Sequence, residues 1–452
     1  MSKNRYILSI DQGTTSSRAI IFDINGQILA QKNFEFKQYY PKNGWVEHNA
    51  NEILDTTINS IKHVITESKI NVEDICTAGI TNQRETVVAW DKSTGQPIYN
   101  AIVWQDRRTE NICENLRSKN LIEEVQKKTG LIVDPYFSAT KIKWITENVN
   151  EANKILSNKN LLVGTIDSWL IWNFTRGDCH LTDATNASRT MLYNINEDQW
   201  DSELLELLNI PHEILPEVKN STDNFGVINK EFFGSEIPIE GVAGDQQAAS
   251  FGQLCFDKGM IKSTYGTGCF MLMNTGDEMM LSKSNLLSTT AYKTSTDRKF
   301  ALEGSIFNAG TVVQWMRDEL NLIKDSSEVE ELASKSKNSI YFVPAFTGLG
   351  APYWRSDIRG SIHGITRDTT KADVALAALK SICFQTKDLF TCLIKDTGTE
   401  TKDFVMRVDG GMSRNNLMMQ YLSDILGIKI ERPVNQESTA TGAAYLAGLQ
   451  SG

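Results

Sequence analysis

The chain opens with short apolar runs separated by polar turns. Apolar residues fill positions 6–10 and 19–24, and a mixed stretch at 27–34 follows the dipeptide Asn25-Gly26. Asn-Gly between two such stretches is a strong signal for a β-hairpin. The pattern predicts a meander of three strands, with the polar segment Asp11 to Arg18 as its first turn.

Helical and strand patterns alternate through the first half of the chain. Isoleucines at 53, 58, 61 and 65 lie between polar residues, which predicts an amphipathic helix over 52–68. Further short strands are expected at 76–80, 87–90, 100–104 and 161–165, and a helix at 167–174. Such alternation is typical of an α/β sheet with helices on its faces.

The second half repeats the opening pattern. Strands expected at 260–263 and 269–273 flank Tyr265-Gly266-Thr267-Gly268, which gives strand, Gly/Thr loop and strand again and indicates a weak internal duplication. The later elements expected are helices over 305–320 and 372–392, a strand at 404–408 that ends in Asp409-Gly410-Gly411, and a helix from 415. We therefore expect two domains, 1–250 and 251–452.

Composition narrows the class of protein. The net charge of −10 argues against nucleic acid or an anionic membrane as the main partner. The seven cysteines are scattered without a C-x-x-C spacing, which favours reduced thiols. We find no apolar run long enough to span a membrane and no signal peptide core, so we expect a cytoplasmic protein.

The first turn carries the chemistry of a phosphate site. Gly13 lets backbone N–H groups approach an anion, and the hydroxyl and guanidinium groups beside it can bond phosphate oxygens. Asp11, at the end of a buried strand, is placed to hold Mg²⁺ through water. The alternative is a polar hairpin tip with a salt-bridged Asp and Arg. The candidate phosphate ligands are Thr14, Thr15, Ser16 and Arg18.

Nucleotide binding, if present, needs an architecture without a P-loop, since neither G-x-x-x-x-G-K-[ST] nor G-x-G-x-x-G after a strand occurs. The turn at 11–18, the loop at 265–268 and the Gly-Gly turn at 409–411 supply one, with Asn415 in reach of a purine. Singly, each is more often a tight turn. In this order over two α/β halves they resemble the ATPase architecture of actin, hexokinase and sugar kinases. The expected fold class is α/β, with two actin-like, hexokinase-type (ribonuclease H-like) ATPase domains and an interdomain cleft.

Longer motifs make the resemblance specific. The chain closely resembles the FGGY family of carbohydrate kinases along nearly its whole length, and within it the glycerol-phosphorylating members. The stretch Asn82-Gln83-Arg84-Glu85 separates these from pentulose-phosphorylating members. The other distinctive stretches are residues 9–18, 79–86, 100–105, 134–137, 244–247, 263–270 and 344–354.

The resemblance implies an activity and its setting. It implies ATP-dependent phosphorylation of glycerol to sn-glycerol 3-phosphate in glycerol catabolism, with Mg²⁺, in a cytoplasmic homo-oligomer (dimer or tetramer). One alternative is a kinase for another short polyol or sugar. Another is an actin-like ATPase switch that phosphorylates nothing.

The resemblance also assigns roles to single residues. Asp245 would be the general base, with a helix-capping Asp as the alternative. Arg84 and Glu85 would fix neighbouring hydroxyls, with a surface ion pair as the alternative, and Asp11 would order the magnesium. Tyr136 and Gln246 would complete the hydroxyl shell, while Trp104 and Phe270 would pack on the carbon chain unless they are plain core. The nucleotide would be lined by Thr267, Gly310, Gln314, Gly411 and Asn415.

Two features depart from the family pattern. The segment Asn229 to Gly234 lacks the Gly-rich, Arg-bearing loop that binds fructose 1,6-bisphosphate, and Glu231 stands where other members carry a phosphorylated His. The chain also ends before the point usual in the family. We therefore expect the small and apolar residues of Ala440 to Leu449 to leave an exposed apolar surface.

Overall fold

The computed structural model describes residues 5–355, 357–399 and 404–452. Unit 1 comprises Met1–Gly252, Thr289–Phe300 and Thr439–Gly452, and unit 2 comprises Gln253–Ser288 and Ala301–Ser438. Each unit has its own buried apolar cluster. None of the helices in the described ranges combines the length and apolarity that a bilayer crossing requires.

Unit 1 is organised around a six-stranded sheet. Its strands, in sheet order, are β15 (Val227–Ile228), β16 (Ile237–Gly244), β6 (Ile75–Asn82), β1 (Tyr6–Gln12), β2 (Ser16–Asp23) and β3 (Ile28–Glu35). β1, β2 and β3 form the predicted antiparallel meander. β6 is parallel to β1, and β16 is parallel to β6. The predicted site segments therefore follow strands that share one sheet.

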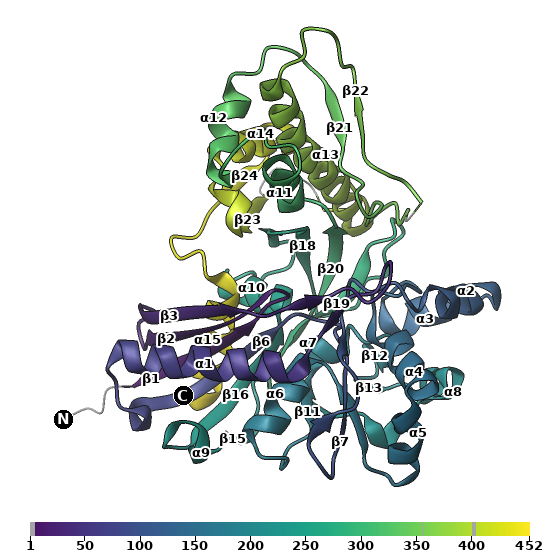
Figure 1. Cartoon of the computed structure of the whole chain (residues 1–452), viewed down its shortest axis with the longest axis vertical. Coiled ribbons are helices and arrows are strands. Elements are labelled where there is room, and N and C mark those ends of the chain that lie inside the picture. Colours follow the sequence, from purple (N-terminus) through teal and green to yellow (C-terminus); the bar gives the residue numbers. More distant parts are fainter. Residues whose placement is uncertain (1–4, 356, 400–403) are drawn as a thin grey trace. The chain divides into compact units, whose positions relative to one another are not determined.

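Helix α1 (Ala50–Ser68) confirms the helix predicted from the isoleucine spacing. The side chain of Asn49 accepts hydrogen bonds from the first N–H groups of the helix. Ile53, Ile61 and Val64 are buried, and α1 lies along β2 and β3 (Figure 1).

The remaining elements of unit 1 complete its α/β layers. The small sheets are β4 (Gln38–Tyr39), β5 (Glu47–His48) and β9 (Ala101–Ile102); β10 (Leu161–Gly164), β7 (Val88–Asp91) and β8 (Gln96–Pro97); β11 (Leu181–Asp183) and β14 (Glu217–Lys219); and β12 (Tyr193–Asn194) and β13 (Gln199–Trp200). The helices are α2 (Glu110–Ser118), α3 (Ile122–Thr129), α4 (Ser138–Asn148), α5 (Asn150–Ser157), α6 (Ile166–Phe174), α7 (Ala184–Ala187), α8 (Ser202–Leu208), α9 (Lys230–Phe233) and α10 (Asp245–Gly252).

Unit 2 repeats the core of this arrangement, which confirms the predicted duplication. Its sheet has the order β19 (Leu287–Lys293), β20 (Arg298–Ile306), β18 (Cys269–Gly276), β17 (Ile261–Tyr265), β23 (Val405–Asp409) and β24 (Lys429–Glu431). β17 is antiparallel to β18 and parallel to β23, and β23 is parallel to β24. The same directions relate β1 to β2, β6 and β16.

Three of the four α-helices described in unit 2 were predicted, and α12 (Val329–Ser334) was not. The four are α11 (Gly310–Asp318), α12, α13 (Lys371–Thr397) and α14 (Asn416–Leu426), and β21 (Tyr341–Val343) pairs with β22 (Ser361–His363). The helix predicted over 305–320 is wrong at its start, because Ser305 and Ile306 end strand β20 and the helix begins at Gly310. The apolar residues that precede Ser305 therefore belong to the buried strand β20 and not to the face of a helix.

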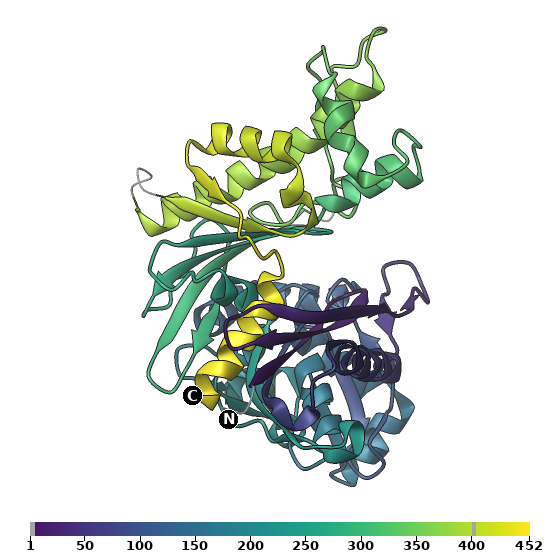
Figure 2. The same ribbon diagram turned by 90° about the vertical axis from the view of Figure 1, so that its left-hand side faces the viewer.

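The predicted exposed surface at Ala440 to Leu449 is wrong for most of the stretch, in which only Tyr445 and Leu449 are exposed large side chains. This stretch lies in α15 (Ser438–Ser451), which packs along β1 and β2 (Figure 2). A Cβ on Gly79 would lie 2.1 Å from the carbonyl oxygen of Ala443, and a Cβ on Gly241 would lie 2.4 Å from the nitrogen of Ala447. The helix therefore fits against the sheet only because these strand positions carry no side chain. Ala440, Ala443, Ala444, Leu446 and Ala447 are all buried.

Candidate active site

Two charged residues follow strand β6 inside unit 1. Arg84 is 3% exposed and Glu85 is 1% exposed, so they are not a surface ion pair. Glu85 has a backbone φ of 61°, in the left-handed region that non-glycine residues rarely occupy. Strained backbone of this kind is concentrated at functional sites.

Arg84 brings three other predicted ligands together. Its Nε lies 3.2 Å from Oδ1 of Asp245 and 3.9 Å from Oε1 of Glu85. Its Nη2 donates to the Tyr136 hydroxyl at 3.5 Å. Its Nη1 donates to Oε1 of Gln247 at 3.3 Å, a contact that the sequence did not predict. Hydrogen-bond donors and acceptors therefore converge around the guanidinium of Arg84.

Asp245 begins α10 directly after β16. Its Oδ1 accepts from the backbone N–H of Gln246 at 2.7 Å, so the carboxylate satisfies one N-terminal donor of the helix. Its side chain is nevertheless 29% exposed, in contrast to the buried Arg84. The preceding residue is fixed, because the N–H of Gly244 donates to Oγ1 of Thr185 at 2.9 Å. The carboxylate is thus both anchored and reachable.

Aromatic residues join the polyol cluster to the first phosphate turn. The rings of Trp104 and Tyr136 meet edge to face, with centroids 5.6 Å apart. Nε1 of Trp104 donates to Oγ1 of Thr14 at 3.0 Å. Trp104, the predicted contact to the carbon chain, therefore also orients Thr14, a predicted phosphate ligand.

The turn from Asp11 to Arg18 is tight and braced. The N–H of Gly13 donates to the carbonyl of Ser16 at 2.9 Å, and Asp11 lies opposite Arg18 in the β1–β2 register. Gln83 donates through Nε2 to Oε1 of Gln12 at 3.1 Å and to the carbonyl of Gly13 at 3.2 Å. Beside it, burial lowers the pKa of His48 to about 3, so this ring is neutral. The turn that carries Thr14, Thr15 and Ser16 is thus fixed by the residues that precede Arg84.

Asp11 is the candidate metal ligand in this turn. Among the described residues, no group of three or more His, Cys, Asp or Glu side chains could hold a metal ion. A single carboxylate fits the usual mode of Mg²⁺, which keeps several waters and binds substrate phosphates.

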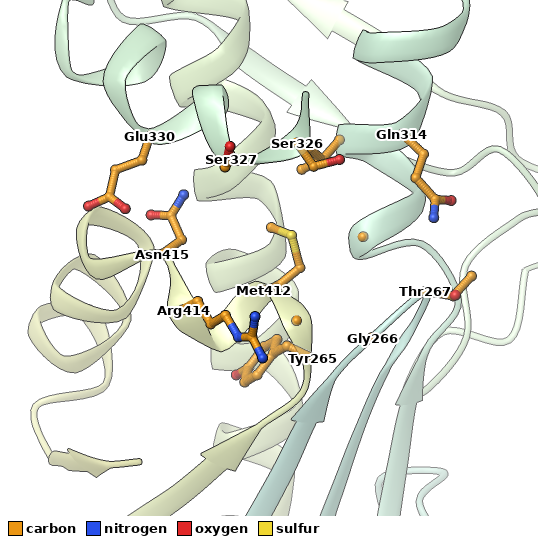
Figure 3. A pocket seen from close by; sticks show the side chains of 13 residues that line it. Tyr265, Gly266, Thr267, Gln314, Ser326, Ser327, Glu330, Met412, Arg414 and Asn415 are labelled. Atoms are coloured by element: carbon orange, nitrogen blue, oxygen red, sulfur yellow. The ribbon is translucent and has the colours of Figure 1, made fainter. Parts of the chain in front are cut away.

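Unit 2 contains a pocket of about 370 Å³ (Figure 3). All five predicted nucleotide residues line it. The full lining is Tyr265, Gly266, Thr267, Gly310, Val313, Gln314, Ser326, Ser327, Glu330, Gly411, Met412, Arg414 and Asn415.

The β17–β18 turn and the start of α11 form one wall of this pocket. The N–H of Gly310 donates to the carbonyl of Gly266 at 2.9 Å, and a Cβ on Gly310 would lie 2.5 Å from that oxygen. Only glycine allows the helix N-terminus to approach the turn this closely. Helix N-termini attract anions through their unpaired N–H groups and their dipole.

Asn415 forms the N-terminal cap of α14 at the opposite wall. Its Oδ1 accepts from the N–H of Met418 at 2.8 Å. The carboxamide oxygen is therefore committed to the helix, and a bound base would meet the amide N–H₂ group.

Several residues of the two sites were missed from the sequence. In unit 2, Ser326, Ser327, Glu330 and Arg414 line the pocket. In unit 1, the fully buried Arg189 donates through Nε to Oε1 of Glu85 at 2.7 Å, and its guanidinium lies 5.6 Å from the ring centroid of Tyr136. The sequence signal was the run of mostly small and polar residues from Asp183 to Thr190, which lacks apolar alternation; the structure shows that the run is buried.

The remaining predicted substrate ligands are Gln246 and Phe270. Gln246 is 6% exposed on α10, beside Asp245. Phe270 belongs to unit 2, on β18 opposite Thr264 and shortly after the β17–β18 turn.

The two related sheets, the buried polar cluster around Arg84 and the pocket of unit 2 are features of ATP-dependent sugar and polyol kinases. The N-terminal domain of the FGGY family of carbohydrate kinases matches residues 6–252, and its C-terminal domain matches residues 261–451. The chain therefore belongs to the FGGY family of carbohydrate kinases.

Individual relatives show which members of the family the chain is similar to. The chain is 55% identical to a glycerol kinase of Petrotoga mobilis, over 99% of this chain and 90% of that protein. The crystal structure of Plasmodium falciparum glycerol kinase with ADP matches with a TM-score of 0.90 at 42% identity, covering 99% of this chain and 90% of that one. A ligand-bound xylulose kinase from Lactobacillus acidophilus has a TM-score of 0.86 at 24% identity, with 99% and 89% covered, and so shares the fold.

Proposed function

We propose that this chain is an ATP-dependent glycerol kinase, which makes sn-glycerol 3-phosphate for glycerol catabolism. The observation that carries the proposal is the convergence of Glu85, Tyr136 and Asp245 on Arg84. Arginine offers only donors and a carboxylate only acceptors, so together they can fix adjacent hydroxyls of a short polyol. The 53–55% identity to proteins named glycerol kinase supports glycerol over other polyols.

The transfer step follows from these roles. A terminal hydroxyl oxygen of glycerol attacks the γ-phosphorus of ATP in line, and its proton passes to the carboxylate of Asp245. The bond from the γ-phosphorus to the bridging oxygen breaks, and ADP leaves. Arg84 and Glu85 would orient the acceptor, while the aromatic rings of Trp104 and Tyr136 would cover its carbons and exclude water.

The nucleotide is assigned to the unit 2 pocket. Thr267 and Gly310 would meet its phosphates, while Gln314, Gly411 and Asn415 would line the nucleoside. Thr14, Thr15, Ser16 and Arg18 would bind the transferred phosphate. Mg²⁺, held by Asp11 through water, would neutralise phosphate charge. We further propose a cytoplasmic homo-oligomer, as the family resemblance implies.

A coupled ADP-release assay tests the proposal. We expect turnover with glycerol to exceed turnover with erythritol, xylulose or no acceptor. Release of ADP that is equal with and without acceptor would indicate an ATPase switch, and preference for another acceptor would indicate a different kinase.

The base assignment is tested in the same assay. Asp245→Asn keeps the side-chain shape but removes the proton acceptor, so turnover should fall roughly 10²-fold or more while glycerol still binds. Asp55→Asn, on the exposed side of α1, is the control. Turnover near that of the unmodified chain would refute the role of Asp245.

A further inference from the structure

A fully buried lysine lies beneath the loop that carries Tyr136. Lys141 is on α4, and its Nζ donates to three consecutive main-chain carbonyls. The distances are 2.5 Å to Pro135, 2.8 Å to Tyr136 and 3.0 Å to Phe137. An ammonium group has three N–H donors, so these carbonyls use all of them.

The charged groups facing Lys141 are committed elsewhere. Three carboxylates surround it, with the thiol of Cys113 on α2. Each carboxylate already pairs with an arginine: Asp106 with Arg108 at 2.8 Å, Glu85 with Arg189 at 2.7 Å and Asp134 with Arg107 at 2.7 Å. The ammonium is therefore bound by the loop rather than by a counter-ion. Burial lowers the pKa of Lys141 to about 8, although these carboxylates act in the opposite direction.

The same loop is held from its other side. Oδ1 of Asp134 accepts the N–H of Tyr136 at 2.8 Å, while both Asp134 oxygens accept from Arg107. The main chain of Tyr136 is thus fixed through its N–H by Asp134 and through its C=O by Lys141. Loss of one N–H from Lys141 leaves two side-chain donors for three buried carbonyls, so the loop loses a charge-assisted hydrogen bond.

We propose that Lys141 is a positioning residue of the acceptor site. Its protonated form holds Tyr136 in the conformation that binds the polyol, and loss of the proton loosens the loop and weakens glycerol binding. This inference rests on the proposed function, because it takes Tyr136 as a glycerol ligand. ATP binding, which is assigned to unit 2, stays unchanged.

Stability changes in the opposite direction to binding. The pKa of Lys141 in the folded chain lies below the value of 10.5 for an unperturbed lysine. Between these values the unfolded chain holds more protons, so Lys141 makes the free energy of unfolding rise with pH. Weaker glycerol binding over this interval cannot therefore be ascribed to unfolding caused by Lys141.

Isothermal titration calorimetry of the full chain with glycerol, without nucleotide, tests the inference. Between about pH 7 and about pH 9.5 we expect the Kd to rise about tenfold, the effect of losing one hydrogen bond to a charged group. The fall in the association constant should have its midpoint near pH 8. Lys141→Met should bind weakly and without this pH dependence. Lys143→Met, two residues along the same helix and paired with Glu147 at 2.6 Å, should behave as the unmodified chain.

A flat profile for the unmodified chain, or the same pH dependence in Lys141→Met, would overturn the inference. If Lys141→Met does not fold, the profiles of the unmodified chain and Lys143→Met decide, because the dependence must appear in both. Absence of glycerol binding near pH 7 would overturn the proposed function as well.

Discussion

Removal of Arg189 should damage both the stability and the acceptor site of unit 1. Arg189 and Glu85 are both buried and lie 2.7 Å apart. Arg189→Met leaves a chain of similar length without charge. Oε1 of Glu85 then still has Nε of Arg84 nearby, but at the longer distance of 3.9 Å.

The magnitude follows from burial and distance. With an effective dielectric constant of about 20, the Coulomb attraction is about 6 kcal/mol at 2.7 Å and about 4 kcal/mol at 3.9 Å. Breaking a buried pair from one side costs about 3–5 kcal/mol, because the remaining charge stays buried. We expect Arg189→Met to lose a free energy of unfolding in this range. Glycerol affinity should fall with it, since Glu85 is no longer held.

A double-mutant cycle in urea provides the assay. Combining Arg189→Met with Glu85→Gln removes both charges, so the double variant should be more stable than the sum of the single losses, by about 1–3 kcal/mol. Arg176→Met is the matched control, because Arg176 forms an exposed pair with Glu231 at 3.0 Å and should lose about 1 kcal/mol or less. Additive losses in the cycle would refute the reasoning.

Two further predictions concern the nucleotide pocket and a buried acid. Gly310→Ala places a Cβ 2.5 Å from the carbonyl oxygen of Gly266, so we expect the KM for ATP to rise about tenfold while the glycerol Kd stays unchanged; equal weakening of both would indicate misfolding. Burial raises the pKa of Asp167 to about 7, so the stability that it contributes is complete below about pH 4 and is lost as the pH rises through 7. Asp167→Asn should therefore increase the free energy of unfolding at about pH 8, by up to about 4 kcal/mol, and much less at about pH 5. Urea unfolding at both pH values measures this, and an equal change at both would contradict it.

Local patterns in the sequence were enough to predict much of the fold. The opening meander, α1 and the strand–turn–strand at Gly266 are each specified by residues close in sequence, through side-chain period and turn chemistry. The boundary at Gly310 was misplaced because an apolar run at the end of a buried strand resembles the start of a helix. The packing of α15 on the sheet could not be predicted from residues close in sequence, because its partners Gly79 and Gly241 lie far away in the chain.

The candidate site divides in the same way. Asp245, Arg84 and the glycine-rich turns of the pocket directly follow strands. Their motifs are therefore short, contiguous stretches that can be recognised in the sequence. Arg189 acts through Glu85, which is 104 positions away in the sequence, whereas Lys141 donates to main-chain carbonyls of the Tyr136 loop just before it. The polar run around Arg189 does not indicate a partner so far away in the sequence, and main-chain carbonyls as acceptors for Lys141 leave no side-chain motif.

The packing of α15 constrains how unit 1 folds during translation. Oγ of Ser9 donates to the carbonyl of Ala440 at 2.7 Å, a contact between residues 431 positions apart. On the ribosome, the first strands emerge long before the helix that covers them, and all of Gln253–Ser438 is translated in between. Domains generally fold as units during synthesis, N-terminal first. Here unit 1 lacks helix α15 until translation has passed residue 439. The bare faces of Ile20 and Phe22 are meanwhile a surface that chaperones would recognise, and a nascent chain stalled within unit 2 would keep it open.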